Sequence, residues 1–407
     1  MSISGKGQSA WPVMLSAAAI LMITMGARQS TGLFVAPLNS ATGLGIVSIS
    51  FALAVGQFVW GLAQPIFGAI ADKRGSYQVL IVGGLMLAGG LALTPLATSE
   101  WSLMVTMGIL SAAGAGAGSF SILIGATAGQ LNPERRAFAG GFINAGGSFG
   151  QFVFAPLLQA IIGVFGWVAA ILTMAATTLL TIPLASYLVK DSAVASGAAS
   201  SRPTMGLWQQ VRQAMVNPSY LCLHAGFFTC GFHVAFLVTH LPGEVSLCGH
   251  AASVSAASLA LIGLFNIAGS LFAGAMGSRY RMKYILAIMY GSRAVLIILY
   301  LLAPKTELTF YLFAAALGFT WLATVPPTAG LVGKLFGTQY LATLFGLTLL
   351  SHQIGGFLGA WLGGLTMAHD GNYLWMWYAD IGLAAAAALV NLPIREAKVV
   401  PAVVAAK

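Results

Sequence analysis

Charged residues are scarce in this sequence. Asp, Glu, Lys and Arg make up 7% of its 407 residues, whereas about a quarter of a typical soluble domain is charged. Hydrophobic residues make up 58% of the chain. This composition excludes a soluble globular protein and predicts that most of the chain lies inside a lipid bilayer.

Cysteines and catalytic motifs are also scarce. Cys222, Cys230 and Cys248 have neither C-x-x-C spacing nor a metal-ligand pattern, so we interpret them as small apolar residues of helices. The sequence contains no paired carboxylates, H-E-x-x-H or G-x-S-x-G, and the glycines at 114–118 lack the Lys-Ser/Thr ending of a nucleotide-binding loop. We therefore expect no enzyme, no metal and no cofactor.

Apolar runs recur along the whole chain, and each is long enough to cross a hydrocarbon core of about 30 Å. The 50 glycines fit this interpretation, because small residues allow transmembrane helices to approach one another closely. We predict an all-α membrane protein with twelve transmembrane helices. Their expected ranges are 11–36, 46–70, 76–97, 101–125, 137–162, 165–189, 218–242, 251–276, 284–303, 308–332, 341–367 and 373–394.

The basic residues are distributed unevenly between the two sides of this topology. With the N-terminus in the cytoplasm, eleven of the 18 Lys and Arg residues fall in inner loops and four in the tails. Lys305 alone falls in an outer loop, and Arg28 and Arg293 lie within helices. This positive-inside pattern predicts a multi-pass protein of the cell inner membrane with both termini cytoplasmic. It also explains the net charge of +9 without nucleic acid.

The chain divides into two related halves. Residues 191–203 are rich in Ser and small residues and predict a flexible linker. We therefore expect a six-helix bundle at 1–190, a cytoplasmic linker at 191–217 and a second six-helix bundle at 218–407. Gly26-x-Arg28 and Gly231-x-His233 lie 205 positions apart, which places Arg28 and His233 at equivalent points of the two halves.

The loop after the second helix resembles the signature of the major facilitator superfamily, G-x-x-x-D-[KR]-x-G. The matching residues are Gly68, Asp72, Lys73, Arg74 and Gly75. The resemblance implies the major facilitator fold, in which two six-helix bundles hold a substrate near the membrane midplane, and a conformational gating role for this loop. A second copy begins at Gly274 and has Ser278 in place of the acidic residue.

Within the superfamily, the first helix resembles that of the monocarboxylate transporters. Those proteins carry a basic residue followed by small and aromatic residues, as the stretch from Arg28 to Phe34 does. The stretches 231–236 and 239–242 resemble a group of bacterial permeases. In the eighth helix, Asn266 and Ser270 stand where the animal transporters carry Asp and Arg, so their coupling carboxylate is not carried over to this chain.

Three formal charges fall inside the expected helices: Arg28, Arg293 and Asp380. The resemblance implies that the ninth and twelfth helices are neighbours. Since Arg293 and Asp380 differ in depth by roughly 7–8 Å at 1.5 Å per residue, we predict that they form a structural ion pair or share a polar cluster. The alternative is that each side chain snorkels or contacts water separately.

That pairing would leave Arg28 without an acidic partner, at a cost of about 2.5–3.5 kcal/mol at a helix centre. Its planar fork of donors suits a carboxylate, so we expect Arg28 to bind an anion. The alternative is that backbone carbonyls and water satisfy it.

Other polar residues at helical spacing are candidates for the rest of the substrate site, although each is equally compatible with an interhelical hydrogen bond. They are Thr24, Thr31, Gln57, Asn144, Ser148, His233, Asn266, Trp321, Thr324, His352 and Gln353. The repeat predicts that His233 faces Arg28 across the cavity. His233 and His352 are the candidate proton carriers, and uniport or proton-free anion exchange remain open.

We predict a secondary active transporter that moves a small organic anion, a monocarboxylate, by alternating access. The expected partners are the substrate and the lipid bilayer, and we expect a monomer. The main alternative is an exporter of drugs or other amphipathic compounds on the same fold. A sensor on this fold is the other alternative, but it would bring an extra soluble domain.

Overall fold

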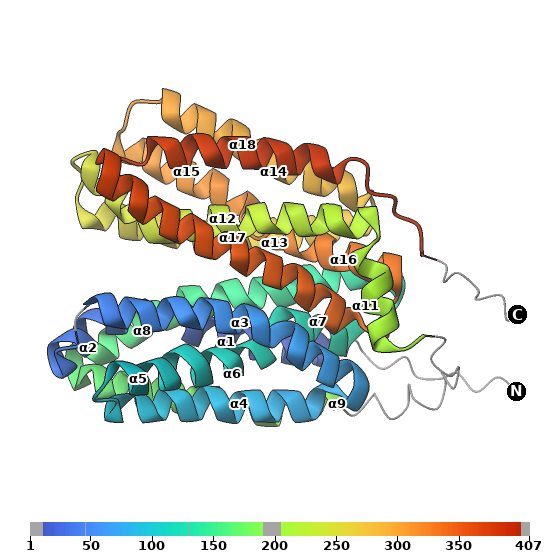
Figure 1. Cartoon of the computed structure of the whole chain (residues 1–407), viewed down its shortest axis with the longest axis horizontal. Coiled ribbons are helices and arrows are strands. Elements are labelled where there is room, and N and C mark those ends of the chain that lie inside the picture. Colours follow the sequence, from blue (N-terminus) through green and yellow to red (C-terminus); the bar gives the residue numbers. More distant parts are fainter. Residues whose placement is uncertain (1–10, 45, 129, 190–204, 400–407) are drawn as a thin grey trace, which may run out of the picture.

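The computed structural model describes residues 11–44, 46–128, 130–189 and 205–399, and no strand occurs in these ranges. The expected linker at 191–203 lies outside the described residues. The helices form two groups, which lie one above the other in Figure 1. We call the group from α1 to α9 the N-bundle and the group from α12 to α18 the C-bundle.

One span of the N-bundle, which the sequence predicts as a single helix, changes geometry along its length. The expected fourth span begins as α5, continues through a π-helical stretch, η3, and ends as α6 and α7. The helices of this bundle are α1 (Trp11–Gln29), η1 (Thr31–Phe34), α2 (Val35–Thr42), α3 (Ile46–Arg74), α4 (Ser76–Leu93), η2 (Thr94–Leu96), α5 (Glu100–Leu103), η3 (Met104–Ser111), α6 (Ala112–Ala117), α7 (Phe120–Ala128), α8 (Pro133–Thr178) and α9 (Thr181–Val189).

The C-bundle is preceded by a short helix, α11, whose Gln210 donates from Nε2 to the carbonyl of Phe336 at 3.0 Å. The expected tenth span consists of two helices, α15 and α16, with a non-helical break at 321–324. The helices are α11 (Leu207–Met215), α12 (Pro218–Leu247), α13 (Ala252–Gly277), α14 (Met282–Leu302), α15 (Glu307–Thr320), α16 (Val325–Phe336), α17 (Leu341–Asp370) and α18 (Leu374–Asn391).

Eleven helical stretches of the described residues are long and apolar enough to cross a membrane. The first part of α8 occupies the remaining expected span, 137–162, and continues into the sixth through Gly166. Gly166 has φ 83°, a left-handed conformation that glycine adopts without strain and other residues rarely adopt. The predicted all-α fold with twelve transmembrane helices is confirmed.

The two bundles meet at one end of the molecule. We call the end that carries Lys73, Arg74, Arg279 and Arg281 the basic end, and the opposite end the far end. The ribbons of α3 and α17 approach one another toward the basic end, near α11, and diverge toward the far end, near α2 (Figure 1). A Cβ on Gly68 of α3 would lie 2.7 Å from the carbonyl oxygen of Ala342 of α17. The basic end is therefore closed by direct backbone packing.

An open apolar groove of about 340 Å³ lies in the far half, where α8 of the N-bundle adjoins α13 and α15. It is lined by Phe152 of α8, by residues of α13 such as Leu261 and Leu264, and by Tyr311 of α15. The helices α3 and α17 thus touch at the basic end and diverge toward the far end (Figure 1).

Glycines bring α12 and α17 of the C-bundle into contact along their backbones. A Cβ on Gly231 would lie 1.7 Å from the carbonyl oxygen of His352, and one on Gly355 would lie 2.0 Å from that of Phe228. Such contacts leave no room for a methyl group. The two helices therefore depend on glycine to keep this spacing.

We expect Gly231→Ala to destabilise the protein by about 1–3 kcal/mol, because the added methyl group overpacks a rigid backbone contact. The matched control is Gly263→Ala in α13, where an added Cβ would meet nothing within 4 Å. Thermal unfolding in detergent measures both changes. Equal midpoints for the two variants would contradict the close contact of α12 and α17.

Candidate functional site

Arg28 lies in the last turn of α1, where the negative end of the helix dipole favours a cation. Its Nη2 donates to Oε1 of Gln57 on α3, and its Cζ lies 4.0 Å from the centre of the Trp60 ring, a cation–π contact. Among the described residues, Gln57 supplies the one hydrogen-bond acceptor of the guanidinium, and no carboxylate pairs with it. Arg28 therefore has only neutral partners among the described residues.

A small cavity of about 50 Å³ lies beside Arg28. Thr31, Gln57 and Ser111 contribute hydroxyl and amide groups to its wall, and the remaining lining is apolar. The lining residues come from the first four spans. The cavity therefore lies within the N-bundle rather than between the bundles.

The two threonines predicted beside Arg28 have different positions. Thr31 lines the cavity, and its Oγ1 donates to the carbonyl of Arg28 at 2.8 Å. Thr24 instead donates to the carbonyl of Gly118 at 2.9 Å and so satisfies the backbone at the junction of α6 and α7. Arg28, Thr31 and Gln57 are thus the predicted residues that the structure brings together, whereas Thr24 has a packing role.

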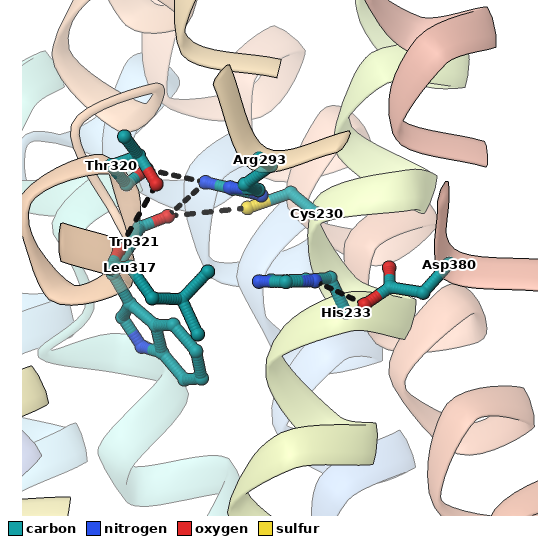
Figure 2. Close-up of polar contacts among 7 residues, drawn as sticks. All are labelled: Cys230, His233, Arg293, Leu317, Thr320, Trp321 and Asp380. Atoms are coloured by element: carbon teal, nitrogen blue, oxygen red, sulfur yellow. Dashed lines mark hydrogen bonds and ion pairs between the residues drawn. The ribbon is translucent and has the colours of Figure 1, made fainter. Parts of the chain in front are cut away.

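Arg293, on α14, caps a broken helix in the interior of the C-bundle. Its Nη2 donates to the carbonyls of Thr320 and Trp321, where α15 ends inside the bundle (Figure 2). The last carbonyls of a helix have no partner within the helix and carry its partial negative charge. The fully buried Arg293 therefore donates hydrogen bonds to carbonyls at this helix end and places a positive charge beside its negative dipole.

The predicted ion pair between Arg293 and Asp380 is wrong. Nδ1 of His233 lies 2.5 Å from Oδ2 of Asp380, and both side chains are fully buried. Helices α14 and α18 do pack together as expected. The prediction compared depths along the two helices and ignored rotation about their axes, which turns Arg293 toward the break and Asp380 toward α12 (Figure 2).

The prediction that His233 faces Arg28 across a central cavity is also wrong. His233 is fully buried in the C-bundle, against Asp380 and the Trp321 ring, whose centre lies 5.5 Å from that of the imidazole. Thr324 lies in the same region, with Oγ1 3.5 Å from Sγ of Cys230. His233 is directed into the C-bundle, and the cavity beside Arg28 lies within the N-bundle.

Four polar residues of α8 and α13 join the two bundles. Asn144 donates to Oγ of Ser270 at 2.8 Å, and Asn266 donates to Oγ of Ser148 at 2.7 Å. We call these four residues the amide cluster. Oδ1 of Asn266 also accepts from the backbone N–H of Leu322, within the break of the tenth span, at 3.0 Å. The predicted substrate contacts Asn144, Ser148 and Asn266 are thus engaged in hydrogen bonds within the protein, and Asn266 also bonds to the backbone of the break.

His352 and Gln353 lie on α17, where Nε2 of Gln353 contacts Nδ1 of His352 at 2.9 Å. A Cβ on Gly61 of α3 would lie 2.7 Å from Cβ of Gln353, so Gln353 lies at the contact between α3 and α17. This contact is separate from the cavity beside Arg28, whose lining comes from the N-bundle. The structure does not bring His352 and Gln353 to that cavity.

The loop motif after α3 contacts the start of α17. Oδ2 of Asp72 accepts from the N–H and the hydroxyl of Thr343 at 2.8 and 2.6 Å, and Oδ1 accepts from the N–H of Ala342 at 3.4 Å. An anion is stabilised at a helix N-terminus because the first N–H groups there lack helical partners. Gly75, with φ 91°, turns the chain into α4. Lys73 and Arg74 are exposed.

The family model of the Major Facilitator Superfamily matches residues 17–360. This chain belongs to that superfamily. The protein is therefore a multi-pass membrane transporter and not an enzyme.

Two relatives align with most of this transporter. It is 25% identical to "Monocarboxylate transporter 13" of Rattus norvegicus, with 89% of this chain and 83% of the relative covered. It is 24% identical to "Oxalate:formate antiporter" of Oxalobacter formigenes, with 90% and 86% covered. The proton:xylose symporter XylE has a similar fold, with a TM-score of 0.73 at 12% identity, covering 93% of this chain and 94% of XylE.

Sequence reasoning missed the break in the tenth span. Its signal is Pro326-Pro327, since proline has no N–H to donate and disfavours helical conformation in the preceding residue. The His233–Asp380 pair left no comparable signal. It joins residues 147 positions apart, and only the packing of α12 against α18 brings them together.

We expect Asp72→Asn to open the basic end, because the lost charge weakens hydrogen bonds worth about 1.5–3 kcal/mol. Spin labels on cysteines at Gln78 and Gln339, both exposed at the basic end on different bundles, report the distance between the bundles. The longer-distance population should rise roughly tenfold or more. Glu134→Gln, an exposed change in the first turn of α8, is the control. We call the hydrogen bonds of Asp72 to Ala342 and Thr343 the Asp72 latch. Identical distance distributions for the two variants would show that this latch does not close the basic end.

Proposed function

We propose that the protein is a secondary active transporter that moves a small organic anion, a monocarboxylate, across the cytoplasmic membrane by alternating access around Arg28. The observation that carries this proposal is a half-buried arginine of the N-bundle, Arg28, that has no carboxylate partner among the described residues. We further propose a monomer with residues 1–190 and 218–407 as its two moving units.

A carboxylate ligand would supply the charge that Arg28 lacks. Attraction between opposite charges is stronger in the low dielectric of a membrane protein than in water. Gln57 accepts from Nη2, and no other acceptor among the described residues is bonded to the guanidinium, which leaves donors for a bidentate carboxylate. The cavity with Thr31 and Ser111 adjoins these donors. A small anion therefore suits this site better than a large one.

The relatives support the same substrate class. One is named as a monocarboxylate transporter and the other as an antiporter of oxalate and formate, and all three of these substrate names describe carboxylates. Together with the unpaired Arg28, these names favour a carboxylate over a sugar, although the fold also resembles a xylose symporter.

The closed basic end fits one state of an alternating-access cycle. The positive-inside pattern predicts that this end lies in the cytoplasm. The Asp72 latch and the contact of Gly68 with Ala342 close it, while α3 and α17 diverge toward the far end (Figure 1). The conformation would then be outward-facing. Release of the latch would allow the bundles to rock and expose the site to the other side.

A second candidate function is the export of amphipathic compounds. The open apolar groove of about 340 Å³ along α8, α13 and α15 favours it, because such a surface suits an apolar ligand. Arg28 argues against a purely hydrophobic substrate.

Uptake into proteoliposomes tests the proposal, with formate, lactate and oxalate as probes. We expect Arg28→Gln to lower anion uptake about a hundredfold, because a lost charged partner costs about 2–5 kcal/mol. Arg28→Lys, which keeps the charge but loses the planar fork, should fall between Arg28→Gln and the wild type.

The matched control is Arg212→Gln, which removes an exposed arginine of α11 and should leave uptake unchanged. Wild-type rates of anion uptake by Arg28→Gln would refute the role of Arg28. Efflux of apolar dyes without any anion uptake would favour the exporter instead.

A further inference from the structure

The His233–Asp380 pair is the ion pair of the described residues in which both side chains are completely buried. The other two ion pairs of the described residues, Lys334–Glu396 and His369–Asp370, each have an exposed cation. Burying ionisable groups is costly, and a surface location would avoid the cost. The position of this pair in the bundle core is therefore not explained by stability alone.

The pair has room for one more proton. Nδ1 of His233 and Oδ2 of Asp380 share one hydrogen bond, while Nε2 and Oδ1 have no hydrogen-bond partner among the described residues. A neutral imidazole that donates from Nδ1 carries a lone pair on Nε2. A proton can therefore be added at Nε2 without breaking the bond to Asp380.

Protonation of His233 changes the net charge of the surrounding core of the C-bundle. Arg293 and Asp380 are both fully buried, and their formal charges cancel when His233 is neutral. A proton on His233 gives the core a net charge of +1. The other titratable side chains near the pair on the packed helices are Cys230, Tyr290 and His352, with His240, Tyr300 and Glu244 toward the far end.

The pair is in contact with the element that joins the two bundles. The imidazole packs edge-on against the Trp321 ring, at 5.5 Å between ring centres, and the carbonyl of Trp321 is held by Arg293 (Figure 2). The next residue, Leu322, accepts from Asn144 of the N-bundle at 3.4 Å. A charge that appears on His233 therefore acts on a segment bonded to both bundles, which is a contiguous physical connection.

We propose that the His233–Asp380 pair is the proton-binding site of the transporter and that one proton bound there accompanies each monocarboxylate. This inference rests on the proposed function. The proton adds to Nε2 of His233, the charge of the pair changes from −1 to 0, and no electron is transferred. A monoanion at Arg28 and a proton at His233 together leave the net charge inside the membrane unchanged, so the coupled step is electroneutral.

The test uses the purified full-length carrier in proteoliposomes that contain a pH-sensitive dye. Formate and lactate gradients drive transport, and dye fluorescence reports proton movement. The variant is His233→Gln with Asp380→Asn, which removes both charges together and keeps two groups able to hydrogen bond. The control is His369→Gln with Asp370→Asn, an exposed pair with a hydrogen bond of 2.6 Å.

We expect the wild type and the control to move one proton per anion. The buried-pair variant should exchange labelled for unlabelled formate at near wild-type rate, but substrate-driven proton movement and accumulation driven by a pH gradient should fall at least tenfold. Wild-type anion exchange together with wild-type proton movement in the buried-pair variant would overturn the proposal. Loss of coupling in His352→Gln, with the buried-pair variant still coupled, would also overturn it.

The wild type separates this proposal from the one on which it rests. Anion exchange without any proton movement by the wild type would refute the proton site and leave the proposed function standing. Absence of exchange for formate, lactate and oxalate would refute both.

If the buried-pair variant does not fold, infrared difference spectra of the wild type with labelled histidine decide. A histidine protonation band on adding formate would support the proton site, and its absence would contradict it.

Discussion

A charge inside a bilayer must find a partner or a solvent, and the internal charges of this protein meet that demand in three different ways. Asp380 bonds to a histidine, Arg293 bonds to the carbonyls at the end of a broken helix, and Arg28 contacts one amide and one indole ring. The first two arrangements supply charge or backbone dipole. The Gln57 amide and the Trp60 ring give Arg28 only a weak dipole and ring electrons. Arg28 is therefore the internal charge for which we propose a ligand as the counter-ion.

The break in the tenth span connects these arrangements. Pro326-Pro327 prevents one continuous helix, and the freed backbone is bonded by Arg293 from the C-bundle side and by Asn144 and Asn266 from the bundle interface. A helix break is tolerated in a membrane protein when neighbouring groups satisfy its backbone. Asn144 and Asn266 also join the two bundles, so a change at the break affects the contact between the bundles.

The sequence was sufficient for the fold because the signals for it are long and repeated: apolar runs, a charge asymmetry and a motif shared by two halves. The absence of an acidic partner for Arg28 was also predictable, since the spans contain so few carboxylates. The partner of Asp380 was not predictable. Depth along a helix follows from counting residues, but the direction of a side chain depends on helix rotation, which is set by contacts such as Gly231 against His352.

The most direct test of this account is an experimental structure of the wild-type protein with bound formate. The account predicts both carboxylate oxygens within about 3 Å of guanidinium nitrogens of Arg28, in the cavity that Thr31 and Gln57 line. Formate bound at the amide cluster or at His352, with Arg28 still in contact only with Gln57 and Trp60, would contradict it.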